Sequence, residues 1–436
     1  MQLKKKSAIS PARVSCALAA ATCSLLGAST AAASGGDDVR VDAAVLFYNE
    51  KNRVTATEPV LRAERHFAND SDLSMKLTLD SLTGASHNGG IISDQPQTFA
   101  SPSGSSAPTS TTSASGESEG GGPYTINPGD LPLDSTFKDQ RFAFNLQYTR
   151  PWVRTLRWLA GFNLSSEHDF SSLGANAGLL WDLNQKNTTL ALSFSHEGDS
   201  ISPVGGVPVP LSSMPSTTTA VAATDKMTQG GSESRTVDDV LFGITQVMTR
   251  RWIMQLNYDI SNSSGYHTDP YKIVTLYDPG TDTIEDYLYE SRPDTRSKKS
   301  IYWENRYHFN QDSVALSYRY MTDDWGIASH TFDIKYRYEL GSGWYLQPHL
   351  RHYTQTAADF WHEYLTPAQN TADLQYASAD YRLGRLQDRT YGLKLGHVLP
   401  HGREWGVRLE SFQQSGDTPA ADVNATIFQL GYTLRW

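Results

Sequence analysis

The sequence predicts an all-β fold, namely a transmembrane antiparallel up-and-down β-barrel of about 16 strands. Apolar and polar residues alternate with a period of two in a long series of short runs, which is the period of a strand. The longest gaps between these runs all fall on odd-numbered connections. The chain also ends on such a run, with Trp436 as its last residue. These three observations predict long extracellular loops and short periplasmic turns.

Residues 1–33 have the pattern of a cleaved secretory signal peptide. A basic start precedes a short apolar run, Val14 to Ala28, and Ala31 and Ala33 place small residues before a cleavage point at Ser34. A single transmembrane helix is the alternative, but the run is shorter than the roughly 20 residues that a bilayer requires.

Cysteine content and charge exclude several classes of function. Both cysteines, Cys16 and Cys23, lie in this N-terminal segment, so the mature chain would hold no disulfide or thiol nucleophile. Lipidation at Cys23 is an alternative to plain cleavage. Without the segment, 37 Lys and Arg residues become 33 against 47 Asp and Glu, and the net charge changes from −10 to −14. We therefore expect no nucleic-acid partner.

Residues 34–436 read as a single outer-membrane β-barrel domain. The mean hydropathy is −0.46, which a strand barrel tolerates because only alternate residues must be apolar. The first run, Val39 to Asn49, places Val45 and Phe47 on one face and Asp42 on the other, and the second begins at Arg53. The other runs begin at Leu73, Phe142, Trp158, Ala175, Leu190, Val240, Trp252, Ile301, Val314, Phe332, Trp344, Tyr391, Trp405 and Ala425.

Four long gaps interrupt the series, at about 84–136, 199–235, 265–297 and 358–387. The centre of the first, Ser101 to Gly122, is low-complexity sequence that we expect to be flexible. A domain linker is the alternative, but similar strands resume on both sides. If the chain starts in the periplasm, all four gaps lie outside the cell, as in a barrel of a Gram-negative outer membrane. The ends of the first loop would either fold inward and narrow the pore or cap the rim.

The last run resembles the terminal strand of outer-membrane barrels, which the barrel assembly machinery reads. One row of this strand is expected to meet outer-membrane lipid, namely Phe428, Leu430, Tyr432, Leu434 and Trp436. The alternate row, with Gln429, Thr433 and Arg435, would face the lumen.

Charged residues in the alternate rows of the last strands predict a mixed-charge lumen. This ladder consists of Glu304, Arg306, Arg319, Asp333, Lys335, Arg337, Glu339, Arg351, Lys394, Arg408 and Glu410. Its charges could merely pair across strands and fill space. Alternatively, opposed basic and acidic rows would create a field across a constriction and select solutes by charge.

Candidate catalytic and metal-binding groups are weak. Ser195, His196 and Glu197 are adjacent on a strand, so their side chains diverge. His349 and His352 also diverge, and Trp361 to Glu363 lies in a loop. Asp278 to Asp282 could hold a calcium ion, although a solvated turn is the simpler interpretation. We expect no catalytic residue, cofactor or metal.

Three segments resemble DUF3570, an uncharacterised family of bacterial outer-membrane proteins catalogued as a domain of unknown function. They are Tyr48 to Pro59, Asp80 to Gly89 and Asp130 to Arg141. The likeness extends over essentially the whole mature chain and implies an outer-membrane barrel. Association of the family with thioredoxin-like or flavin-attaching neighbours implies extracytoplasmic redox or export work.

The sequence leaves three functions open. A porin-like channel or export conduit is the first. A structural barrel that docks a periplasmic or redox-linked partner is the second, and a barrel enzyme is the third. Conductance in a planar bilayer separates the first two functions.

Overall fold

The computed structural model describes residues 38–100, 123–214, 228–369 and 373–436. The predicted signal peptide, with both cysteines, and the low-complexity centre of the first loop lie outside the described residues.

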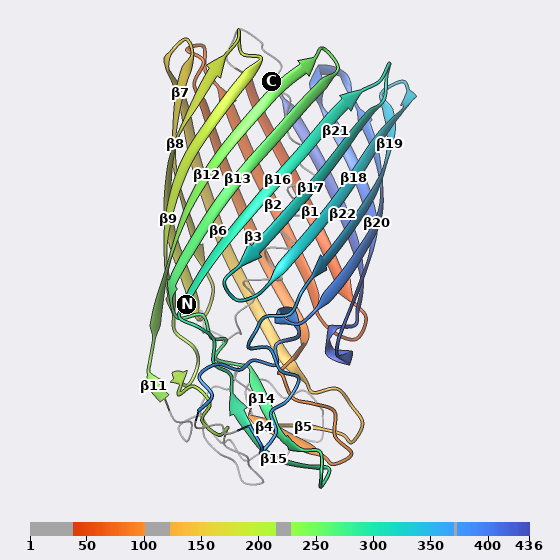
Figure 1. Cartoon of the computed structure of the whole chain (residues 1–436). Helices are drawn as coiled ribbons and strands as arrows, with labels where there is room; N and C mark the ends of the chain where they lie inside the picture. The colour runs from red at the N-terminus through yellow and green to blue at the C-terminus, as the bar shows by residue number, and fades with distance from the viewer. Residues whose placement is uncertain (1–37, 101–122, 215–227, 370–372) are drawn as a thin grey trace, which may run out of the picture.

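Sixteen antiparallel strands close into a barrel, as the alternation predicts (Figure 1). They are β1 (Asp38–Glu50), β2 (Thr55–His66), β3 (Asp72–His87), β6 (Leu133–Val153), β7 (Leu156–Ser166), β8 (Phe170–Leu183), β9 (Thr188–Ile201), β12 (Glu233–Thr249), β13 (Trp252–Gly265), β16 (Thr295–His308), β17 (Ser313–Asp323), β18 (Ala328–Gly341), β19 (Trp344–Gln355), β20 (Leu386–Val398), β21 (Glu404–Gly416) and β22 (Val423–Arg435). Each strand pairs with its neighbour along this series, so the all-β fold class and the count of sixteen are confirmed.

The first and last strands complete the ring. The Val39 amide donates to the Trp436 carbonyl at 3.0 Å, and the Trp436 amide donates to the Val39 carbonyl at 3.1 Å. Further along the same pair, Phe47 lies opposite Phe428. Because residues directly opposite each other project to the same face of a sheet, both rings point outward.

The outer face carries a belt of exposed aliphatic and aromatic side chains. Leu350 and Leu393 are each 50% exposed, and Leu409 is 56% exposed. In β22, Phe428, Leu430 and Tyr432 are exposed on this face. Gln429 lies on the opposite face of the strand and is fully buried. A closed barrel with such a belt fits a lipid bilayer. The protein therefore lies in the cell outer membrane.

All four long connections lie at one end of the barrel, and the C-terminus lies at the other (Figure 1). Parts of these connections form three small two-stranded sheets. The sheets pair β4 (Gln97–Ala100) with β5 (Pro123–Ile126), β10 (Val207–Pro208) with β11 (Thr228–Gly230), and β14 (Ile273–Asp278) with β15 (Thr283–Tyr289). We call the long connections at this end the cap. By the sidedness of outer-membrane barrels, it faces the outside of the cell.

The cap has its own apolar cores. Val274 and Leu288 of the β14–β15 sheet pack with Leu365 and Ala377 of the connection between β19 and β20.

Three short 3-10 helices complete the described structure: η2 (Tyr381–Leu383), η3 (Pro400–Gly402) and η4 (Pro419–Ala421). Among the described residues, no helix is long and apolar enough to span a bilayer.

We predict that Leu393→Arg destabilises the barrel, because it places a charge against lipid near the middle of β20. The expected loss is about 2–4 kcal/mol in the free energy of unfolding, measured by urea titration in lipid vesicles. Asn145→Arg is the matched control, since Asn145 is exposed on the lumen side of β6. Equal losses in both variants would contradict this assignment of faces.

Candidate functional site: the lumen wall and the cap

The structure places the eleven charges of the predicted ladder on the lumen row of β16 to β21. They alternate with exposed outer residues, and they lie opposite one another across strands, as with Asp333 and Arg351 or Lys394 and Arg408. Arg408 is 1% exposed and Glu410 is 4% exposed. Arg408, Glu410 and Lys394 are therefore packed on the wall, whereas Arg306, Arg319 and Arg351 are exposed.

Acidic and basic members of the ladder are near neighbours, and they do not form the opposed rows considered above. Arg337 Nε lies 2.5 Å from Glu339, and Lys335 Nζ lies 3.4 Å from Asp333. The partners are two residues apart on one strand, so their side chains leave the same face next to each other. Local pairing weakens the field of the charges that take part in it.

His349 joins two strands of this wall. Its Nε2 lies 2.7 Å from Asp333 Oδ2, and its Nδ1 lies 2.7 Å from Glu410 Oε1. Both ring nitrogens can donate to carboxylates only in the imidazolium form. The sequence did not predict this role. His349 lies on the same face of β19 as Arg351 and diverges from His352, as predicted. We call Asp333, His349, Arg408 and Glu410 the histidine network.

Inward glycines let the side chains of this wall lie flat. A Cβ on Gly392 would lie 2.6 Å from the Glu410 carboxylate, and one on Gly406 would lie 2.5 Å from Cε of Lys394. A Cβ on Gly396 would collide with the ring of Tyr345. That ring is covered by the Arg337 guanidinium at 3.5 Å, and its hydroxyl donates to Glu404 at 2.5 Å.

The wall from β6 to β13 carries amides and small residues together with the ion pairs of Arg157 with Asp182 and of Arg235 with Asp199. Its lumen row carries Asn145, Gln147, Asn163, Asn176, Gln255 and Asn257. Asn145 and Gln147 are exposed. Arg62 and Lys76 join several of these amides around a cavity of about 360 Å³. The lumen thus has a charged half and an amide-rich half.

A cluster of buried charges holds the cap together. Arg292, from the connection between β13 and β16, lies 2.9 Å from Asp380, and Arg382 lies 2.7 Å from the same carboxylate. Arg292 also pairs with Glu290, which accepts a 2.5 Å hydrogen bond from Ser378. Burial raises the pKa of Glu290, whereas the two arginines outweigh burial and hold the pKa of Asp380 well below its usual range. Two connections are thereby locked into one unit.

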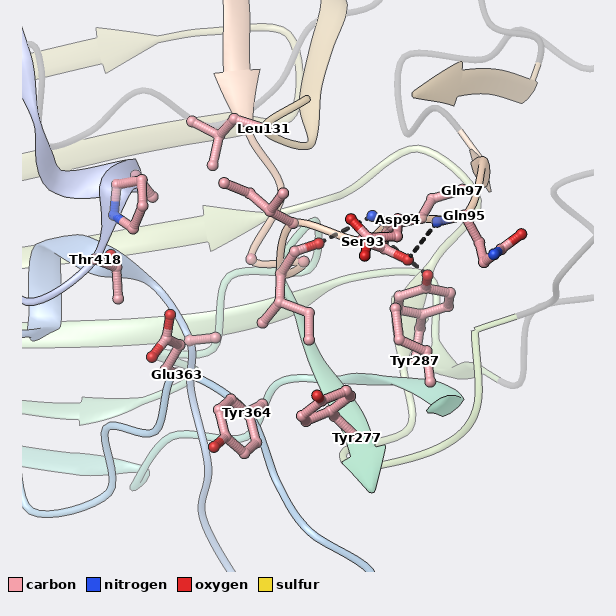
Figure 2. Close-up of a pocket in the computed structure, with 18 of the residues that line it drawn as sticks. Ser93, Asp94, Gln95, Gln97, Leu131, Tyr277, Tyr287, Glu363, Tyr364 and Thr418 are labelled. Atoms are coloured by element: carbon pink, nitrogen blue, oxygen red, sulfur yellow. Dashed lines mark hydrogen bonds between the residues drawn. The ribbon is translucent and has the colours of Figure 1, made fainter. Parts of the chain in front are cut away.

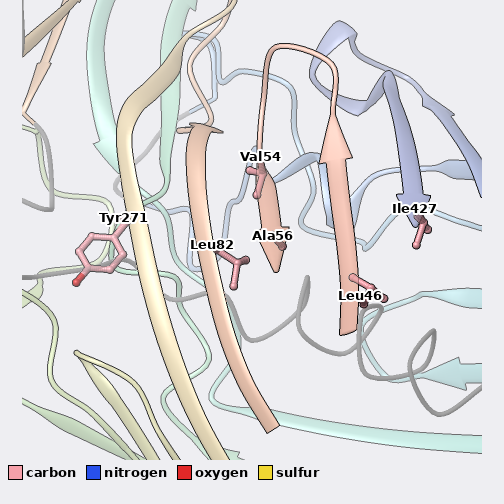
Figure 3. Packing of buried hydrophobic residues seen from close by; sticks show 6 residues of the cluster. All are labelled: Leu46, Val54, Ala56, Leu82, Tyr271 and Ile427. Atoms are coloured by element: carbon pink, nitrogen blue, oxygen red, sulfur yellow. The ribbon is translucent and has the colours of Figure 1, made fainter. Parts of the chain in front are cut away.

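The connection between β13 and β16 crosses the barrel mouth. It leaves the wall six places away from β3 in the ring of sixteen, yet its residues contact the outer end of β3. The Ile273 amide donates to the Asn88 carbonyl at 2.9 Å, and Lys272 donates to the His87 carbonyl. Tyr271 packs in one cluster with Leu46 and Leu82 of the wall (Figure 3). The cap therefore narrows the mouth.

Tyr271 reaches a group of buried carboxylates. Its hydroxyl donates to Asp169 Oδ2 at 2.6 Å, in the turn between β7 and β8. Burial, and then Asp139 nearby, raise the pKa of Glu167 to about 8, and burial raises the pKa of Asp169 to about 6. One oxygen each of Asp139, Glu167 and Asp169 has no hydrogen-bond partner. The cap thus docks where negative charge is poorly compensated.

The remaining sequence candidates do not assemble into an active site. His196 lies 2.7 Å from Asp238 on the outer face, whereas Ser195 donates to Asp239 and Glu197 accepts from Asn163 on the lumen face. Within the described part of the chain, no group of three or more His, Cys, Asp or Glu residues is arranged to hold a metal ion. In the turn from Asp278 to Asp282, the Gly280 amide donates to Asp278 at 2.8 Å.

Comparisons with known proteins add a family. The model of the family described as "Protein of unknown function (DUF3570)" matches residues 15–433. No curated protein matches the sequence.

Solved structures with a similar fold include three proteins of Pseudomonas aeruginosa. OccK5 (OpdH) has 9% identity and a TM-score of 0.40, with 92% of this chain and 98% of that chain covered. OccK2 (OpdF) in complex with glucuronate has 9% identity, a TM-score of 0.39 and coverage of 92% and 98%. The outer membrane protein opdK has 9% identity, a TM-score of 0.38 and coverage of 92% and 99%.

We predict that His349→Ala destabilises the barrel, because it leaves two packed carboxylates without their shared donor. Breaking one partner of a buried ion pair costs about 3–5 kcal/mol, and urea titration in vesicles measures the loss. His352→Ala, on the opposite face of β19, should cost much less. Similar losses for both variants would mean that the histidine network does not stabilise the wall.

We also predict that docking of residues 266–294 weakens as the external pH rises. Both Glu167 and Asp169 have raised pKa values in the docked state, so their protonated forms favour docking. Docking is then strongest below about pH 4 and is lost progressively as the pH rises through about 6 and 8. Hydrogen exchange of this segment, corrected for intrinsic rates, should be faster at pH 8 than at pH 5. Glu167→Gln with Asp169→Asn should flatten this dependence, and an unchanged slope would contradict it.

Proposed function

Because the chain belongs to the DUF3570 family, whose description names no activity, we propose from its geometry that it is an outer-membrane channel for small polar solutes with a partly covered mouth. The observation that carries this proposal is the polar lumen. Amides such as Asn145 and Gln147 are exposed on one side of it, and on the other side Glu410, Lys394 and Tyr345 lie flat over glycines while Arg306, Arg319 and Arg351 are exposed.

The amide-rich half supports passage of hydrated solutes. Amide groups both donate and accept hydrogen bonds, so they can replace water around a polar solute without binding it by charge. The charged half offers ion pairs, such as Arg337 with Glu339, together with the exposed Arg319 and Arg351. Together these surfaces favour polar solutes over apolar ones.

The cap supports control of entry from outside. One connection spans the mouth and is held at its far side by Tyr271, Lys272 and Ile273. Such a crossing segment limits the size of solute that enters, and its release would widen the path. The cap is held as one unit by the Arg292 and Arg382 ion pairs, so we expect it to move as a unit.

We predict that the purified protein conducts in planar bilayers and that Tyr271→Phe raises its open probability about tenfold. The hydroxyl donates to Asp169 and accepts from the Val204 amide, and losing a hydrogen bond to a charged group costs about 1.5–3 kcal/mol. Single-channel recording measures the change. Tyr266→Phe is the matched control in the same connection, because the buried Tyr266 hydroxyl has no hydrogen-bond partner.

Two outcomes would contradict the proposal. Absence of conductance in both the native protein and Tyr271→Phe would favour a structural barrel that docks a periplasmic partner. Equal changes in Tyr266→Phe and Tyr271→Phe would mean that the docked hydroxyl does not control the mouth.

A further inference from the structure

The cap and the short connection between β21 and β22 border a cavity of about 790 Å³ (Figure 2). Four connections contribute to its wall: residues 89–97 after β3, the β14–β15 sheet, residues 363–364 after β19, and residues 418–420 after β21. Its volume is within the range of small-molecule sites, about 300–1,000 Å³. The cavity exists only when these connections are folded together, so it is a property of the assembled cap.

The charge of this cavity is entirely negative. Its carboxylates are Asp94, Asp282, Glu285, Asp286 and Glu363. Among its described lining residues there is no lysine or arginine. Burial, and then Asp417 nearby, raise the pKa of Glu363, as expected for a carboxylate without a close counter-charge. A concave surface of one sign concentrates ligands of the opposite sign.

Tyrosine rings form a second part of the wall. Tyr277 and Tyr364 meet edge to face with their centroids 5.2 Å apart. Figure 2 shows both rings beside Glu363, with Asp94 and Tyr287 on another side of the cavity. Aromatic faces next to carboxylates attract cations, and the attraction increases when the site excludes water.

Apolar side chains and fixed loops complete the cavity. Ile92, Leu131 and Ile284 line it, which suits an organic stem better than a bare inorganic ion. The segment before β4 is held in place because Gln97 donates to the Ile91 carbonyl at 3.0 Å and accepts from Tyr287 at 2.9 Å. This part of the wall is therefore preformed, which lowers the entropic cost of binding.

We propose that this cavity binds a small organic cation, with an ammonium or guanidinium group between Glu363 and Asp282 and an apolar stem against Tyr277 and Tyr364. The absence of a metal-type cluster among the described residues disfavours an inorganic divalent ion. The negative wall disfavours anions. Binding at this site does not require that the barrel conducts, so the inference goes beyond the channel function.

Isothermal titration calorimetry of the full-length protein in detergent micelles tests this site, with agmatine as the probe. We expect saturable binding of agmatine and none of glutarate or glucose. Glu363→Gln and Asp282→Asn should each weaken binding about three- to tenfold, and Tyr364→Leu should weaken it by a similar factor. Raising the salt concentration from 50 mM to 500 mM should also weaken it, because the Debye length falls to about 4 Å.

Asp70→Asn provides the matched control. Asp70 is a carboxylate in the turn between β2 and β3, at the opposite end of the barrel, and its φ of 59° also suits asparagine. The affinity of the Asp70→Asn variant for agmatine should equal that of the native protein. Heat-modifiable migration on gels verifies that each variant remains a folded barrel.

Three results would overturn the proposal. They are equal affinity in Glu363→Gln, Asp282→Asn and the native protein, tighter binding of glutarate or glucose than of agmatine, and no heat of binding from folded native protein. The titration measures binding alone, so its failure is distinct from an absence of conductance in bilayers.

Discussion

The hydrogen-bonded seam between β1 and β22 is the constraint on which the rest of the molecule depends. It removes the two open edges that a sheet in lipid could not satisfy, and it fixes the register of the whole ring. A slip of one residue would exchange the two faces of a strand, placing Gln429 toward lipid and Phe428 toward the lumen. The belt, the polar lumen and the mouth all follow from that one alignment.

The three segments that carry the family resemblance all lie at the cap end of the barrel, where they make specific contacts. In Asp80 to Gly89, Gly89 has a φ of 104° and lies against the Ile273 carbonyl, and Gly84 has a φ of 133°. In Tyr48 to Pro59, the Arg53 guanidinium donates to the Ala420 carbonyl at 2.7 Å. In Asp130 to Arg141, Arg141 donates to Asp80 at 2.5 Å. A pattern of polarity alone would not provide these contacts.

The barrel could be predicted almost completely from the sequence because each strand obeys a local rule with a period of two. All sixteen runs and the side on which the long connections lie agree with the structure. The same alternation assigns charges such as Arg351 and Glu410 to one row of the wall. The alternation of faces does not indicate which charged side chains contact each other. Whether Glu410 bonds to His349, two strands away, depends on rotamers and on the missing side chain of Gly392 between them.

The structure of the cap could not be predicted from the sequence, for a related reason. Its connections have no period, and their contacts join residues far apart in the chain, such as Arg292 with Asp380. The cavity likewise depends on four connections meeting, so Tyr364 and Asp282 gave no local signal of their shared surface. The Tyr271 contact with Asp169 joins connections that are separated by about a hundred residues. Contacts of this kind come from folding the whole molecule and not from any one stretch of sequence.

The inward glycines affect how the width of the lumen can change during the evolution of such a barrel. The number of strands sets the circumference, but the free cross-section depends on how far side chains stand away from the wall. At Gly392, Gly396 and Gly406, the missing Cβ atoms let a carboxylate, a phenol ring and a lysine stem lie down across the neighbouring strand. Replacing one glycine would make the neighbouring side chain stand up into the passage. A single substitution at one of these glycines would therefore change the width of the lumen, while the number of strands stays at sixteen.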